Sequence, residues 1–235
     1  MDHSPDHSPD RSPDDSPLDD AHPVAPAPAD HPSDADDVLE SARWFAGIVR
    51  ASTSAALDAP AGDVEWSCWR TAEHVGDDML AYALQLASGA SEDYLPLLAA
   101  DGGDDIVRVD PAAGPQGLAD SVEGLAVLLA SQVRTSAPSA RAFHPHGTSD
   151  ACGFAAMGVV ELLVHGYDVA RGLGVDVGPG SSLPLPAGPA GRAVVRLFQE
   201  APSTRPEAAL LWCTGRIALP GVPRRDRWRW DSSVR

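Results

Sequence analysis

The residues best suited to chemistry lie in the stretch ELLVHGYDVARGLG, residues 161–174. Glu161, His165 and Asp168 stand at i, i+4 and i+7, so in a helix all three side chains fall on one face. The aliphatic residues 162–164 beside them indicate that this helix is mostly buried. A buried carboxylate without a partner costs several kcal/mol, and a metal ion is an efficient partner. The spacing therefore suggests a metal site, although E-x-x-x-H also suits a buried His–Glu hydrogen bond or an exposed ion pair.

His74, in RTAEHVGDD (70–78), is the candidate third ligand because it falls inside another predicted helix. Two donors from one helix and a third from a facing helix close a tripod around a metal and leave one position open to water. Two histidines and one glutamate are a known ligand set of catalytic zinc, whereas structural zinc wants four protein ligands. Cys68, Cys152 and Cys213 are far apart and form no CxxC, so we expect reduced thiols in the core.

Several further side chains are weighed as contributors to this site. Asp168 is expected to orient His165, with an ion pair to Arg171 at i+3 as the alternative. Asp78 follows His74 at i+4 and could approach the metal, but an exposed acid is the favoured interpretation. Two candidates lie outside the helices that carry the triad. His144, in a loop with His146, could act as an acid, a base or a substrate contact. Arg216, with the arginines of 224–229, could contact an anionic substrate or thiol, although surface solvation is the favoured interpretation of these arginines.

The elements that must position these side chains read as helices joined by Gly/Pro-rich loops. Apolar residues at helical spacing predict four long helices at 36–57, 70–88, 115–135 and 151–173, and two short ones at 190–201 and 206–219. Thr71 is the expected N-cap of the second helix, and IVRVD at 106–110 is a candidate short strand. The alternating βα pattern and the phosphate-binding glycine motifs are missing from the sequence, so we predict an all-α bundle.

Composition divides the chain into three parts. Residues 1–35 begin with Ser-Pro at 4–5, 8–9, 12–13 and 16–17 and continue rich in Pro, Ala and Asp. They are acidic and poor in aliphatic side chains, so we predict a disordered tail. A metal-binding bundle is expected over 36–175, and a C-terminal extension packed on it over 176–235. The globular part, from residue 41 on, has 22 acids against 16 arginines, which argues against nucleic acid as a partner. No apolar run reaches the length of a membrane span, and no signal or transit peptide is recognised, so we expect a cytoplasmic protein.

Two paired segments, WSCWRTAEHVGDDMLAYALQLA (66–87) and GFAAMGVVELLVHGYDVARGLG (153–174), strongly resemble the mycothiol-dependent maleylpyruvate isomerase N-terminal domain family. The stretches at 141–147 and 210–230 are similar to actinobacterial members. The family belongs to the DinB-like superfamily of metal-binding four-helix bundles. The resemblance implies an up-down-down-up bundle holding a divalent metal, usually zinc, on His74, Glu161 and His165.

The resemblance also implies a function. We expect a metal-dependent enzyme that uses a low-molecular-weight thiol, mycothiol or similar, for S-transfer or isomerisation of a small electrophile. The characterised isomerases carry an added C-terminal domain, whereas about sixty residues follow the fourth helix here, so the substrate does not transfer. Two alternatives stay open: a hydrolase that uses metal-bound water, and a non-catalytic binding or regulatory bundle. The expected partners are a small-molecule substrate and a thiol, without nucleic acid or membrane, in a monomer or homodimer.

Overall fold

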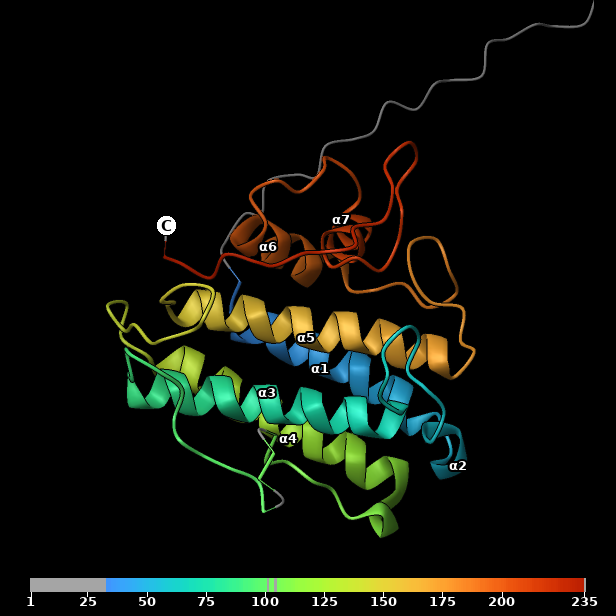
Figure 1. The fold of residues 1–235 in the computed structure, drawn as a ribbon, viewed down its shortest axis with the longest axis horizontal. Coiled ribbons are helices and arrows are strands. Elements are labelled where there is room, and N and C mark those ends of the chain that lie inside the picture. The colour runs from blue at the N-terminus through green and yellow to red at the C-terminus, as the bar shows by residue number, and fades with distance from the viewer. Residues whose placement is uncertain (1–32, 101, 104, 235) are drawn as a thin grey trace, which may run out of the picture.

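A computed structural model of the chain describes residues 33–100, 102–103 and 105–234. The predicted all-α fold is confirmed: the described residues form helices and isolated β-bridges but no strand. Figure 1 shows four long helices side by side with two shorter helices above them. The elements are α1 (Ala35–Arg50), α2 (Ser54–Leu57), α3 (Cys68–Ser88), the 3₁₀ turn η1 (Pro111–Ala113), α4 (Gly114–Thr135), α5 (Ala151–Gly172), α6 (Ala187–Leu197) and α7 (Pro206–Cys213).

The four long helices form the DinB-like bundle that the sequence predicts. The colours in Figure 1 show α1 and α5 running in one direction and α3 and α4 in the other, which is the up-down-down-up order. Because α3 and α4 are parallel, the chain between them must cross the length of the bundle. Residues 89–113 make this crossover along the side of α3, and part of it later proves to border the candidate site.

Helix α5 is the core of the bundle. It is long and apolar enough to cross a membrane by length and composition, but 83% of its most apolar window is buried inside the protein, as in the core helix of a soluble protein. Close packing depends on its glycines: a Cβ on Gly166 would lie 2.4 Å from the Trp44 ring, and one on Gly158 would lie 2.7 Å from Leu129. These close approaches bring α1 and α4 against the helix that carries Glu161 and His165.

Two helix boundaries differ from the prediction because hydroxyl side chains interrupt the backbone ladder. The helix expected over 36–57 ends at Arg50, where Ser52 Oγ donates to the Val49 carbonyl. Thr53 then accepts from Ala56 N and caps α2 as a separate turn. The second helix begins at Cys68, and its N-cap is Ser67 rather than Thr71, because Ser67 Oγ accepts from Arg70 N at 3.1 Å.

The predicted strand at 106–110 is wrong. This segment is irregular and lies against α3, where two carboxylates take the N–H groups that a neighbouring strand would need. Asp77 Oδ1 accepts from Ile106 N at 2.6 Å and from Val107 N at 2.8 Å. Glu73 Oε1 accepts from Val109 N at 2.9 Å. Side chains of α3 therefore hold the crossover extended without any sheet.

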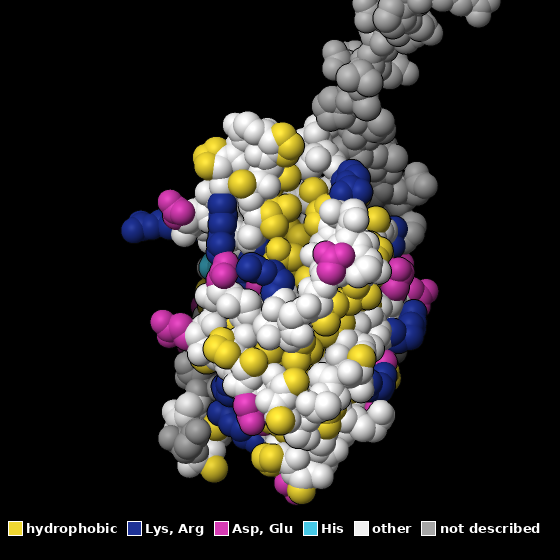
Figure 2. All heavy atoms as spheres, turned by 90° about the vertical axis from the view of Figure 1, so that its right-hand side faces the viewer, with side chains coloured by type: hydrophobic (Ala, Val, Ile, Leu, Met, Phe, Trp, Pro, Cys, Tyr) yellow, Lys and Arg dark blue, Asp and Glu magenta, His cyan; other side chains and the backbone are white. Residues whose placement is uncertain are grey.

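The C-terminal extension packs on α1 and α5. Its helices are shorter than predicted: α6 covers Ala187–Leu197 instead of 190–201, and α7 ends at Cys213 instead of 219, just before the left-handed Gly215 (φ 68°). Arg192 of α6 donates through Nε to Asp37 of α1 at 2.7 Å. Arginine and acidic side chains are interspersed on the face shown in Figure 2, so that face has no continuous basic surface. The predicted tail lies outside the described residues up to position 32; Asp34 caps α1.

Candidate metal centre

Helices α3 and α5 bring the three predicted ligands together. One nitrogen of His74, one oxygen of Glu161 and one nitrogen of His165 all lie within 4.8 Å of one another. The two imidazole rings meet edge to face, with their centroids 5.4 Å apart. Glu161 and His165 are neighbours because they are one turn apart on α5, whereas His74 reaches them from the facing helix. The triad that the sequence assembles from two distant segments is therefore one cluster in the fold.

Each ring nitrogen of His165 faces a carboxylate of its own helix. Nε2 lies 3.3 Å from Glu161 Oε2, and Nδ1 lies 3.2 Å from Asp168 Oδ2. Asp168 is buried, with a side chain 3% exposed. Nδ1 is buried without a well-directed hydrogen bond, with Asp168 as its nearby carboxylate, so Nε2 is the nitrogen left for a metal shared with Glu161. A carboxylate behind a histidine ligand fixes the ring and its tautomer, which is the role predicted for Asp168.

His74 has the same arrangement with a carboxylate from another part of the chain. Its Nδ1 lies 3.3 Å from Asp105 Oδ2 in the crossover, and its Nε2 lies 3.2 Å from Asp78 Oδ2. The edge of Trp66 covers the ring, with centroids 4.8 Å apart. Both histidines therefore turn Nδ1 to an aspartate outside the triad and keep Nε2 for the centre.

An arginine completes the arrangement behind each histidine. Arg216 of the extension binds Asp168 with two donors, Nε to Oδ1 at 3.2 Å and Nη2 to Oδ2 at 2.7 Å. Arg70 of α3 donates to Asp105 through Nη2. We call these two sets the Arg216 chain (Arg216, Asp168, His165) and the Arg70 chain (Arg70, Asp105, His74).

The electrostatics of the two histidines differ. Burial alone would lower the pKa of His165, but its hydrogen bonds to Asp168 and Glu161 outweigh burial and raise the pKa to about 9. Burial lowers the pKa of His74, and the nearby charge of His165 lowers it further. In the metal-free protein at neutral pH, His165 therefore carries a proton and a positive charge while His74 is neutral.

The carboxyl groups respond to the same environment. Burial would raise the pKa values of Glu161 and Asp168, but the hydrogen bond of each to His165 and the charge of Arg216 keep both below their ordinary values. Burial raises the pKa of Asp78 well above its ordinary value, and the neighbouring Glu161 charge raises it further. The centre thus gathers more carboxyl groups than the two arginines and the proton of His165 balance.

These residues fit a divalent metal. Asp78 Oδ2 is buried without a well-directed hydrogen bond, although it lies 3.2 Å from His74 Nε2. Its carboxyl and that of Glu161 lie against each other, an arrangement that a cation would relieve. Two neutral imidazoles and a carboxylate are a donor set that zinc accepts with one position left open. The donor set and the unrelieved negative charge therefore both suit a metal at this point.

Three sequence interpretations change in the structure. Asp168 pairs with Arg216 and His165, whereas Arg171 lies 3.6 Å from Asp63, so the Arg171 alternative is wrong. Asp78 is not an exposed acid, because its side chain is 20% exposed and its carboxylate faces His74. Arg216 is neither a substrate contact nor a solvated surface residue here. It donates to Asp168 and to the Thr214 carbonyl at 2.8 Å, so its positive charge stabilises the carboxylate next to His165.

His144 lies away from the triad. It is buried between Tyr82 and Trp230, with ring centroids 6.1 and 5.9 Å away, and its Nδ1 lies 3.2 Å from Ser232 Oγ. Burial lowers its pKa to about 4, so the ring is neutral in this position. Tyr82 separates the two sites, since its hydroxyl donates to Glu161 Oε1 at 3.5 Å. His144 thus anchors the C-terminal segment beside the bundle.

Sequence reasoning missed Asp105, Arg70 and Tyr82. The signal for two of them was local: Arg70 precedes His74 by four residues, and Tyr82 follows Asp78 by four, so each shares a helix face with a site residue. Asp105 gave no such signal, because it lies in an irregular segment rich in aspartate and glycine. Only the path of the crossover in the folded protein brings Asp105 next to His74.

Comparison with known families supports the resemblance found in the sequence. Residues 38–170, more than half of the chain, match the family described as mycothiol maleylpyruvate isomerase N-terminal domain. The matched part covers α3 and all but the last two residues of α5, and so includes all three members of the triad. Comparisons with curated proteins and with solved structures find no match.

Proposed function

The chain belongs to the mycothiol maleylpyruvate isomerase N-terminal domain family, and on that premise we propose that it is a metal-dependent enzyme acting with a low-molecular-weight thiol. The observation that carries the proposal is the convergence of His74, Glu161 and His165, with an Arg–Asp pair behind each histidine. A divalent metal, zinc by its donor set, would lower the pKa of a coordinated thiol at the open position.

The residues of the chain have defined tasks in this chemistry. Glu161 and the Nε2 atoms of the two histidines would hold the ion, while Asp168 and Asp105 would fix the rings from the Nδ1 side. Tyr82 donates to Glu161 and borders the space beside the centre. Because α5 is buried, these groups are preorganised before any substrate arrives.

Isomerisation by a thiol needs no further reactant. The thiolate adds to one carbon of an activated double bond, and the π electrons move to the electron-withdrawing group. Rotation about the new single bond follows, and the electrons return as the thiolate leaves, so the thiol is regenerated. In S-transfer the thiolate instead displaces a leaving group or opens a strained ring, and the proton lost by the thiol ends on the released atom. The enzyme would work in the cytoplasm, where such thiols are reduced.

The test has two arms. Zinc affinity is measured by chelator competition for the wild type and for H165A, and zinc binding that is equally weak in both overturns the site. Conversion of maleate and of its dimethyl ester to the trans isomers is then followed with zinc-loaded protein, with mycothiol, with glutathione and without thiol. Acceleration over the uncatalysed thiol reaction is expected. No acceleration with any thiol contradicts the thiol chemistry, and thiol-independent hydrolysis of the ester favours metal-activated water.

A further inference from the structure

A cavity of about 430 Å³ opens beside the metal centre, between α3 and the crossover. Three of its lining residues touch the triad. Tyr82 donates to Glu161, while the carboxylates of Asp78 and Asp105 lie 3.2 and 3.3 Å from the two nitrogens of His74. The volume falls in the range of small-molecule sites. The cavity is therefore placed to hold the part of a substrate that does not meet the ion.

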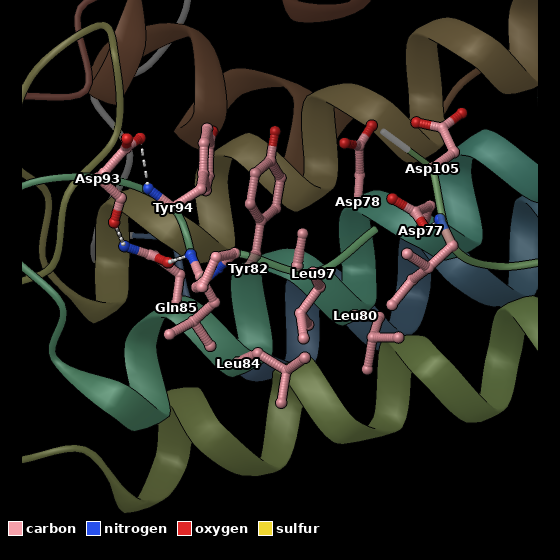
Figure 3. Close-up of a pocket in the computed structure, with 14 residues that line it drawn as sticks. Asp77, Asp78, Leu80, Tyr82, Leu84, Gln85, Asp93, Tyr94, Leu97 and Asp105 are labelled. Carbon is pink, nitrogen blue, oxygen red and sulfur yellow. Dashed lines mark hydrogen bonds between the residues drawn. The ribbon is translucent and has the colours of Figure 1, made fainter. Parts of the chain in front are cut away.

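The lining divides into an apolar and a polar side. Figure 3 shows the polar ends of Tyr94, Tyr82, Asp78 and Asp105 pointing to one side, with leucine side chains on the other. The three leucines labelled there are Leu80, Leu84 and Leu97. A ligand that lays an apolar portion on the leucines would therefore point its reacting end toward the tyrosines and the metal centre.

The charges of the lining have one sign. Among the lining residues that the structure describes there are four aspartates and no lysine, arginine or histidine. Three of the four accept hydrogen bonds. Asp77 accepts from two backbone N–H groups, Asp93 accepts from Tyr94 N at 2.8 Å, and Asp105 accepts from Arg70, whose guanidinium lies over the Trp66 ring. Arg216, the cation expected to hold an anionic substrate, is bound to Asp168 instead. A carboxylate among these lining residues would meet no cationic side chain of the lining.

We propose that this cavity is the substrate subsite and that it selects uncharged, partly apolar electrophiles, such as esters or amides of unsaturated acids, over free carboxylates. The proposal rests on the proposed function only for the location of the reacting centre. The apolar lining supplies the binding surface, and a free carboxylate is disfavoured because the lining would leave it unpaired beside other carboxyl groups.

Dimethyl maleate and maleate are suitable probes because they share a carbon skeleton and differ in charge. Binding of each to the full-length, zinc-loaded protein is measured by saturation-transfer NMR without thiol, so that the result does not depend on turnover. Leu97 lines the cavity and is 47% exposed, whereas its neighbour Leu98 is 71% exposed and outside the lining, which makes the two a matched pair. Any coordination of maleate by zinc is common to all variants.

Leu97→Trp is expected to weaken diester binding about tenfold by filling the cavity, while Leu98→Trp leaves it unchanged. Leu97→Lys is expected to shift the preference about tenfold toward maleate by placing a cation in the cavity, and Leu98→Lys is the control. Diester binding that survives Leu97→Trp, or equal preferences in the two lysine variants, overturns the proposal. Failure of thiol-dependent turnover with these binding results intact would overturn the thiol chemistry alone. Circular dichroism checks that each variant is folded.

Discussion

The Arg216 chain and the Arg70 chain have the same order of groups but are built from different parts of the molecule. In the Arg216 chain the aspartate and histidine share α5, and the arginine arrives from the C-terminal extension. In the Arg70 chain the arginine and histidine share α3, and the aspartate arrives from the crossover. Each chain therefore fastens a peripheral segment of the protein to one ligand of the metal centre.

The chains differ in burial and charge. Asp168 is 3% exposed and Arg216 13%, whereas Asp105 is 18% and Arg70 27% exposed. His165 lies between two carboxylates, Glu161 and Asp168, and its pKa rises to about 9, while burial and the charge of His165 lower the pKa of His74. A metal bound here would therefore have to displace a proton from His165, so the Arg216 chain should control metal affinity more strongly than the Arg70 chain.

Removal of either histidine should have the largest effect. His165→Ala and His74→Ala each delete one of the three proposed ligands, so we expect zinc affinity to fall by more than the roughly 10–100-fold that loss of an outer partner costs. Chelator competition measures both, and the exposed His146 provides a matched control, His146→Ala. A histidine variant that binds zinc as tightly as this control would remove that residue from the ligand set.

Substitution of the two aspartates should show which of the Arg216 chain and the Arg70 chain contributes more to zinc affinity. Asp168→Asn keeps the size of the side chain but removes the buried charge behind His165, and we expect zinc affinity to fall about 100-fold, the upper end of effects of outer partners. Asp105→Asn should cost about tenfold, the lower end, because Asp105 is more exposed. The same chelator assay compares them. Equal losses would show that the difference in burial has no energetic consequence at this centre.

The pH dependence of zinc affinity should show which histidine loses a proton when zinc binds. Because His165 titrates at about 9 without metal, apparent zinc affinity should fall about tenfold per unit as the pH drops below that value. Asp168→Asn removes a group that raises this pKa, so the break should move to lower pH. Asp105→Asn should leave it in place. Zinc titrations between pH 6 and 10, about the range that brackets this pKa, measure the break, and a shift caused by Asp105→Asn alone would reverse the assignment.

The arginines should have the smallest effects. Arg216→Met leaves Asp168 without its charged partner and should weaken zinc binding roughly fivefold, the equivalent of about 1 kcal/mol. Arg70→Met should cost less, since this arginine is more exposed. Arg224→Met, in the same extension but paired with Asp63, is the control for loss of a cation there. An equal loss in Arg224→Met would mean that the extension acts through its overall charge.

The sequence alone predicts much of the bundle and all three members of the triad. Helical periodicity locates the long helices because burial of a continuous apolar stripe leaves a regular trace, and the spacing of Glu161 and His165 is local geometry of one helix. Asp168 was predictable for the same reason, since it lies one turn beyond His165. The helix ends were harder to predict. Ser67 and Thr53 each cap a helix through a single hydrogen bond, and neighbouring residues in the sequence are equally plausible caps.

The tertiary structure decided what stands behind and beside the triad. Asp105 and Arg216 reach the centre across 31 and 48 residues of chain, and no periodicity links positions so distant. The N–H groups of Ile106, Val107 and Val109 could have joined a strand, but the carboxylates of Asp77 and Glu73 accept from them instead. Local spacing thus determined which side chains could hold a metal. Packing of the crossover and the extension decided which charges support that metal, because only the folded chain sets the distances between them.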